Sequence, residues 1–241
     1  MHKALWASAM GLAAVTLVTE ARADGANLHS ADVLRPGDNM LYGEVGWPDM
    51  VFGFQHGMSD KVDIGFRFAF IYGFEYTPGV RLGLGMSVPI RITPLKREKV
   101  SVQIHFDPGL KFDGFGNDNC ALNRNCPGDY GYYGGGLAFG LSLGVGVDVG
   151  IHLTREATLS FGLNMPIYIN FTNGVYGAIP LLFGPAFEYH IDEHMSVGGN
   201  VKLGPSILAA CGPDVDVYGD CVSHSGADIG FITQAYFAYR L

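Results

Sequence analysis

The last fourteen residues of the chain, DIGFITQAYFAYRL, alternate between two kinds of side chain. Counted back from Leu241, every second residue is apolar or compatible with lipid, whereas Arg240, Gln234 and Asp228 between them prefer water. A period of two places the two sets on opposite faces of one β-strand. The sequence therefore predicts a strand with one face toward an apolar medium and the other toward a polar one.

The same alternation recurs from Met40 onward and stops at turn signals. It is clearest in residues 100–113, where Val, Ile, Leu and Phe occupy one face and Ser, Gln, His, Asp and Lys the other. Because the two faces of a strand meet different surroundings, each such segment predicts one strand. We expect ten strands, over residues 40–47, 50–56, 62–72, 80–92, 100–113, 137–153, 157–171, 179–191, 197–207 and 228–241.

Residues 228–241 resemble the C-terminal β-signal of Gram-negative outer-membrane β-barrel proteins, which their assembly machinery recognises. Together with the repeated alternation, this resemblance covers residues 24–241. It implies an all-β fold, a transmembrane antiparallel up-and-down β-barrel of ten strands, with eight or twelve as alternatives. Even strand numbers, and strands of about 9–11 residues, are typical of bacterial barrels. The implied location is the cell outer membrane, and the implied partners are outer-membrane lipid and the barrel assembly machinery.

The connections between the expected strands are of two kinds. Short, charged connections cover residues 59–61, 96–99, 154–157 and 192–194, and longer ones cover 73–79, 114–135, 172–178 and 209–226. Strict alternation of the two kinds is what periplasmic turns and extracellular loops give. The tight turn Trp47-Pro48-Asp49 departs from this rule, because its position should be extracellular.

The first residues predict a secretory signal peptide, with a short basic start, an apolar run and the cleavage site Ala21-Arg22-Ala23. We expect residues 1–23 to be removed and residues 24–241 to form the barrel domain. Residues 24–39 are expected to be a short periplasmic lead, and the sequence shows no plug. Removal of Lys3, Arg22 and Glu20 changes the formal net charge from −8 to −9. An acidic barrel is not expected to bind nucleic acid.

The four cysteines form two close pairs along the chain, Cys120 with Cys126 and Cys211 with Cys221. Exported chains meet oxidising conditions, so we predict two local disulfides in surface loops. Zinc is the alternative, but neither segment offers a histidine at ligand spacing. Aspartates 214, 216 and 220 do not match a calcium-binding loop. The sequence therefore predicts no metal site and no cofactor.

The polar faces of the strands predict the contents of the barrel interior. Small barrels are filled by side chains, so opposite charges are expected to pair across the lumen. Inward glycines leave two possibilities open, a packed interior with some water or a narrow pore. The polar residues expected to line the lumen are Arg67, Arg81, Arg91, His105, Asp107, Lys111, Asp148, His152, Glu188, His190 and Lys202.

Three functions remain open on the sequence. The leading hypothesis is a non-enzymatic outer-membrane barrel that stabilises the envelope or passes small solutes. The second is a surface recognition protein whose loops, residues 114–135 and 209–226, bind a ligand or another cell. The third is a hydrolase at the extracellular rim, as in the omptins, which activate water with acidic residues and a histidine.

The hydrolase hypothesis has candidates but no motif. A deacylase would need a serine beside a histidine, and Ser142, Ser160 and His152 are the candidates. Because such groups without defined geometry are weak evidence, we predict no catalytic residues. The omptin-like candidates are Asp107, Asp113, Asp118, Asp214, Asp216, Asp220 and His224.

Overall fold

The computed structural model describes residues 27–73, 82–113, 138–171, 175–215 and 221–241. Its regular structure is a single antiparallel β-sheet. Among the described residues there is no helix long and apolar enough to cross a membrane. The strands are β1 (Asn39–Trp47), β2 (Asp49–Ser59), β3 (Val62–Ile71), β4 (Gly83–Ser87), β5 (Ile90–Lys96), β6 (Val100–Asp113), β7 (Ala138–His152), β8 (Ala157–Asn170), β9 (Val175–Pro180), β10 (Leu182–His190), β11 (Met195–Val215) and β12 (Cys221–Arg240).

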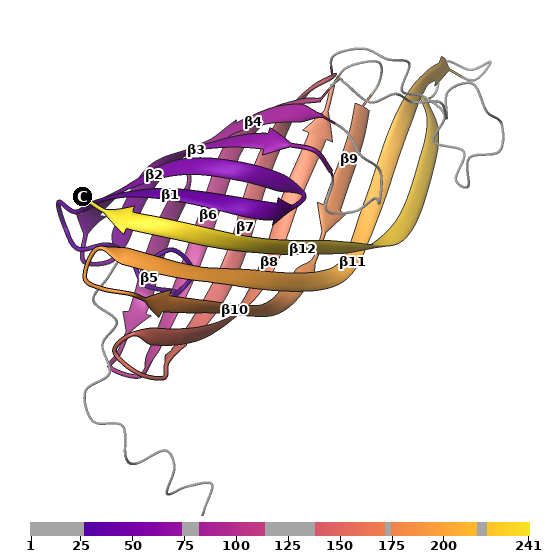
Figure 1. Cartoon of the computed structure of the whole chain (residues 1–241). Coiled ribbons are helices and arrows are strands. Elements are labelled where there is room, and N and C mark those ends of the chain that lie inside the picture. Colours follow the sequence, from indigo (N-terminus) through magenta and orange to yellow (C-terminus); the bar gives the residue numbers. More distant parts are fainter. Residues whose placement is uncertain (1–26, 74–81, 114–137, 172–174, 216–220) are drawn as a thin grey trace, which may run out of the picture.

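The sheet closes into a barrel because the last strand pairs with the first (Figure 1). The β12–β1 register runs from Arg240 opposite Met40 to Thr233 opposite Trp47. β4 and β5 both pair with β3 and β6, and β9 and β10 both pair with β8 and β11. The ring therefore has ten strand positions, two of which hold two segments each. This confirms the predicted all-β, ten-stranded antiparallel barrel.

Two expected strands are interrupted where the sequence predicted continuous ones. The strand expected at residues 80–92 is divided after Ser87, and the one at 179–191 is divided at Leu181. Pro89 and Pro180 adjoin these interruptions and have no N–H to give to the ladder. The turn after Trp47, whose peptide bond to Pro48 is cis, does join β1 to β2 in a hairpin.

The expected long loop at residues 209–226 is mostly strand. β11 continues to Val215 and β12 begins at Cys221, so the hairpin leaves only residues 216–220 between its strands. Cys211 pairs in register with Ser223, and Val215 with Cys221, with a register shift between the two pairs. The small residues of this stretch, Ala, Cys, Gly and Ser, hid the alternation in the sequence.

The short connections all lie at one end of the barrel, which also carries the C-terminus and which we call the short-turn end (Figure 1). The turn between β10 and β11 illustrates their local stabilisation. The Oδ1 atom of Asp192 accepts hydrogen bonds from the backbone N–H groups of His194 (2.7 Å) and Met195 (2.8 Å). These bonds favour the carboxylate and lower the pKa of Asp192 below its ordinary value.

Apolar side chains cover the outside of the barrel, whereas the inside holds buried polar side chains together with apolar ones such as Met40, Val51 and Ile71. In β10 buried and exposed residues alternate without a break, and the exposed ones include Phe183, Phe187 and Tyr189. β3 likewise exposes Phe66 and buries Asp63 completely. Globular monomers in water rarely expose apolar patches beyond a few hundred Å². The large exposed apolar residues follow the strands around the ring, which is the arrangement that suits a barrel in lipid.

Candidate functional site

Residues 27–34 lie inside the barrel, and we call this segment the plug. Asn27, Ser30 and Asp32 are at most 4% exposed, and so are the apolar residues that follow, up to Leu34. Leu34 packs with Met40 and other buried residues of the wall. The sequence predicted a periplasmic lead over residues 24–39 and no plug. For residues 27–34 that prediction was wrong, because the interior offers them both apolar contacts and hydrogen-bond partners.

Six consecutive carbonyl groups of the plug accept hydrogen bonds from side chains of the wall. The guanidinium of Arg91 donates from Nη1 to the carbonyl oxygens of Asn27 (2.9 Å) and Leu28 (3.0 Å). A buried segment outside the sheet needs such donors, because an unpaired buried carbonyl is costly. The other donors are Ser160 Oγ to His29 O (2.7 Å), Ser101 Oγ to Ser30 O (3.3 Å), Thr93 Oγ1 to Ala31 O (3.3 Å) and Gln103 Nε2 to Asp32 O (3.1 Å).

Two buried carboxylates of the wall accept hydrogen bonds from backbone N–H groups of the plug. Glu188 Oε2 accepts from His29 N (2.8 Å), and both of its oxygens lie 3.2 Å from Leu28 N. Asp63 Oδ2 accepts from Leu34 N at 3.2 Å. Glu188 and Asp63 are fully buried. Their charges are therefore directed at the plug rather than at solvent.

Arg91 and Asp63 form a buried, bidentate ion pair that belongs to this arrangement. Arg91 Nε donates to Asp63 Oδ1 (2.8 Å) and Arg91 Nη2 donates to Asp63 Oδ2 (2.6 Å). Gln55 Nε2 adds a bond to Asp63 Oδ1 at 2.6 Å. Fork-to-fork pairing of this kind fixes both side chains. It therefore holds Arg91 in position to donate to the plug carbonyls.

Asp32, the one charged residue of the plug, is less well paired. Its Oδ2 lies 3.4 Å from Lys96 Nζ and 3.7 Å from His152 Nε2. Within the described part of the chain, neither of its carboxylate oxygens accepts a hydrogen bond. His152 bonds instead to Thr158 Oγ1 through Nδ1 (3.0 Å) and to Ser101 Oγ through Nε2 (3.3 Å). Asp32 therefore interacts with Lys96 and His152 through electrostatic attraction, without a hydrogen bond to either.

Glycine on the wall makes room for the plug. A Cβ atom on Gly150 would lie 2.2 Å from the carbonyl oxygen of Ser30, and one on Gly57 would lie 2.0 Å from that of Arg35, the residue directly after the plug. Both contacts are with backbone, which cannot move aside independently. Next to Ser30, Ala31 has a φ of 61°, a conformation that costs a non-glycine residue about 1–2 kcal/mol. The wall and the plug are thus fitted closely to each other.

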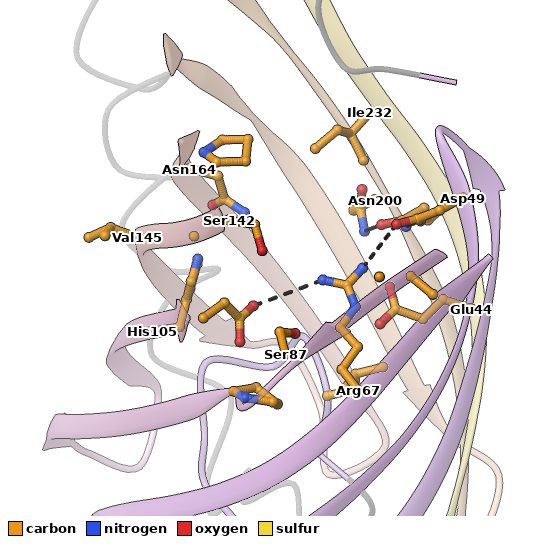
Figure 2. A pocket seen from close by; sticks show the side chains of 18 of the residues that line it. Glu44, Asp49, Arg67, Ser87, His105, Ser142, Val145, Asn164, Asn200 and Ile232 are labelled. Atoms are coloured by element: carbon orange, nitrogen blue, oxygen red, sulfur yellow. Dashed lines mark hydrogen bonds and ion pairs between the residues drawn. The ribbon is translucent and has the colours of Figure 1, made fainter. Parts of the chain in front are cut away.

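Between the plug and the β1–β2 turn, the interior contains a cavity of about 190 Å³ (Figure 2). Leu28 and His29 of the plug bound it on one side, and it reaches Pro48 at the β1–β2 turn. The plug contacts wall residues near the short connections, so it lies at the short-turn end, and the cavity extends from it toward the β1–β2 turn.

Two polar clusters line the cavity. In the first, Arg67 Nη2 lies 3.6 Å from Asp49 Oδ2, and Arg67 Nη1 lies 3.9 Å from Asp107 Oδ2. Gln234 Nε2 donates to Asp49 Oδ1 at 2.7 Å. The second is tighter and is centred on Asp148. Its contacts are Lys202 Nζ to Asp148 Oδ1 (3.0 Å), Lys202 Nζ to Asn164 Oδ1 (2.8 Å) and His105 Nδ1 to Asp148 Oδ2 (2.9 Å).

The structure places most of the expected lumen residues in the interior. Lys111 lines the cavity with its Nζ 5.3 Å from the ring centroid of Tyr168. His190 is buried, with its Nε2 3.9 Å from Glu188 Oε1. Cys211 and Cys221 lie on described strands, but their side chains are outside the description. Residues 1–23, Arg81, Cys120 and Cys126 lie outside the described residues, so the signal peptide and both disulfides stay predictions.

The residues considered for catalysis are used differently in the fold. Asp107 lines the cavity beside Arg67 rather than the rim. Ser160 donates to a plug carbonyl, and His152 bonds to Thr158 and Ser101. In the described part of the chain, no group of three or more His, Cys, Asp or Glu side chains is placed to hold a metal ion.

No protein-family model matches the chain, and no curated protein sequence matches it. The resemblance of the C-terminal strand to outer-membrane barrels therefore rests on the residue pattern, and the function has to be argued from the interior.

Proposed function

We propose that the protein is an integral outer-membrane β-barrel whose lumen is closed by its own amino-terminal segment. It serves as a non-conducting barrel of the envelope, with a cavity and long connections at the end away from the periplasm. The apolar side chains around the outside and the C-terminal alternation support insertion in lipid. The short connections, the C-terminus and the plug belong to the periplasmic end.

The plug is the observation that carries this proposal. A small-solute pore needs a continuous polar path, whereas residues 27–34 cross the interior and are bonded to β5, β6, β8 and β10. The charges of Arg91 and Glu188 could have lined a pore. Instead, both side chains form hydrogen bonds with backbone groups of the plug. We therefore favour the envelope role over the narrow-pore role.

Planar-bilayer recording of the refolded mature chain tests the closed lumen. We expect the complete protein to be silent, and a variant lacking residues 27–34 to give discrete openings. Heat-modifiable gel migration of both proteins confirms that each barrel is folded. A milder variant, Gly150→Val, places a side chain where Ser30 O now lies, so it tests the same point should the deletion fail to fold. Steady openings of the complete protein, unchanged by Gly150→Val, would refute the proposal.

The location is tested separately. Expressed with its own leader in a Gram-negative host, the protein is expected in the outer-membrane fraction of a density gradient. Recovery in the soluble periplasmic fraction would contradict membrane insertion, whatever the bilayer recordings show.

A further inference from the structure

Two arginines of the interior are paired differently. Around the plug, the ion pair of Arg91 and Asp63 is closed to hydrogen-bonding distance, with contacts of 2.6 and 2.8 Å. In the cavity, Arg67 stands between Asp49 and Asp107 at 3.6 and 3.9 Å. Arg91 is thus held by short contacts with one carboxylate, whereas Arg67 has only longer contacts with two. Arg67, labelled in Figure 2, lines the cavity, and its Nε has no hydrogen-bond partner among the described residues.

The charges that line the cavity balance. Four acidic and four basic side chains contribute to its wall, and each sign occurs on several strands. A ligand with a net charge would meet repelling groups as well as attracting ones. The lining therefore favours a ligand without net charge. The acidic residues are Glu44, Asp49, Asp107 and Asp148, and the basic ones are Arg67, Arg91, Lys111 and Lys202.

Donors and acceptors in the cavity wall have unused capacity. Arg67 Nε, Asp107 Oδ1 and Asn200 Oδ1 are buried, and none has a hydrogen-bond partner among the described residues. Arg67 Nε is a donor, whereas the other two atoms are acceptors. A hydroxyl group can act as an acceptor for the first or as a donor to one of the other two, so several hydroxyl groups can serve all three. An ammonium or a carboxylate group can do only one of the two, and would also disturb the pairing of Arg67 with Asp107.

We propose that the cavity binds a small, neutral, polyhydroxylated molecule, a monosaccharide or a cyclic polyol. Its volume of about 190 Å³ lies below the ~300–1,000 Å³ of pockets for drug-sized ligands. Ala69, Leu110 and Pro166 also line it and offer apolar surface to the C–H groups of a ring. The direction of entry, from the end away from the plug, rests on the proposed function, but the binding itself does not.

Gly85 provides a way to fill the cavity without breaking its polar groups. It lines the cavity from β4, and a Cβ there would meet Ile71 Cδ1 at 3.4 Å and Ala69 Cβ at 3.5 Å, which are ordinary contacts. Gly85→Leu therefore projects a side chain into the ligand's space. Gly43→Leu is the matched control. A Cβ on Gly43 meets only Val51 O, at 3.7 Å, and Gly43 does not line the cavity.

Calorimetric titration of the detergent-solubilised protein tests the proposal, with D-glucose and myo-inositol as probes. L-alanine and glucose 6-phosphate represent zwitterionic and anionic ligands. We expect at least one neutral probe to bind saturably, with Gly85→Leu and Arg67→Met each weakening it by about tenfold or more and Gly43→Leu leaving it unchanged.

Three results would overturn the proposal. They are no saturable binding of either neutral probe up to roughly 10 mM, tighter binding of alanine or the sugar phosphate, and binding that Gly85→Leu leaves intact. None of these results bears on whether the lumen is closed, because the bilayer recordings test that point separately. Failure of this inference can therefore be distinguished from failure of the proposed function.

Discussion

Glu188→Gln is expected to loosen the plug while keeping the shape of the wall. The Glu188 carboxylate is fully buried and accepts the N–H groups of Leu28 and His29 at 2.8–3.2 Å. Glutamine keeps the length of the side chain and one acceptor oxygen, but it has no charge. The substitution therefore acts on the docking of the plug and leaves the strand pairing of β10 in place.

The size of the effect follows from the two N–H donors involved. A hydrogen bond to a charged group contributes about 1.5–3 kcal/mol, and one between neutral groups about 0.5–1.5 kcal/mol. Replacing the charged acceptor for two donors weakens docking by about 2–3 kcal/mol in total. Because about 1.4 kcal/mol corresponds to a factor of ten, the undocked population should rise about 30- to 150-fold.

Amide hydrogen exchange measures this population directly, since Leu28 and His29 can exchange only when their bonds open. In Glu188→Gln we expect their exchange to accelerate by the factor above, with the amides of β12 unchanged. Glu193→Gln, an exposed substitution in the next turn, is the control and should leave all rates as they are. An acceleration below about threefold in Glu188→Gln would mean that the charge does not hold the plug.

Three further substitutions test other parts of the fold. Gly150→Val should accelerate the same amides, because its side chain overlaps the carbonyl of Ser30; Gly43→Val is the control, and equal rates in both would refute the close fit. Arg91→Met leaves Asp63 buried without its partner, so the free energy of unfolding should fall by about 3–5 kcal/mol. Urea titration in lipid vesicles measures this change, and an unchanged midpoint would show that the pair is dispensable. Phe66→Lys on the outer face should cost about 2–4 kcal/mol if that residue lies near the bilayer midplane, and a neutral result in the same assay would contradict its contact with lipid.

The barrel could be predicted from the sequence because the pattern that defines it is local. In β6, nearly every second residue from Val100 to Phe112 is a large apolar one, and a strand with one face toward an apolar medium satisfies such a run. The end of the C-terminal strand, which pairs with both β1 and β11, carries the same signal.

The plug could not be predicted because its partners are remote in the chain. His29 contacts Glu188 and Ser160, which are 159 and 131 residues away. The sequence pattern is the same whether an inward polar side chain contacts water or a backbone group of the plug. One signal was available, the concentration of Asp63, Arg91 and Glu188 toward the short-turn end. Interpreting it required the register between strands, which the alternation of single strands does not supply.

His29 connects the plug to the cavity, so the two proposals have a joint consequence. Its backbone N–H bonds to Glu188, and its ring Nε2 lies 3.9 Å from Glu44 Oε2 and 3.5 Å from Asn200 Nδ2 at the cavity wall. A ligand that requires contact with His29 binds only the state in which the plug is docked. By linkage it must then slow exchange of the Leu28 and His29 amides by the factor 1 + [L]/Kd, about tenfold at a ligand concentration nine times Kd. Glu188→Gln should weaken ligand binding only once the undocked state becomes a large fraction of the protein. If the bound probe leaves these amides exchanging at their original rate, the cavity and the plug are independent, and His29 is not part of the binding site.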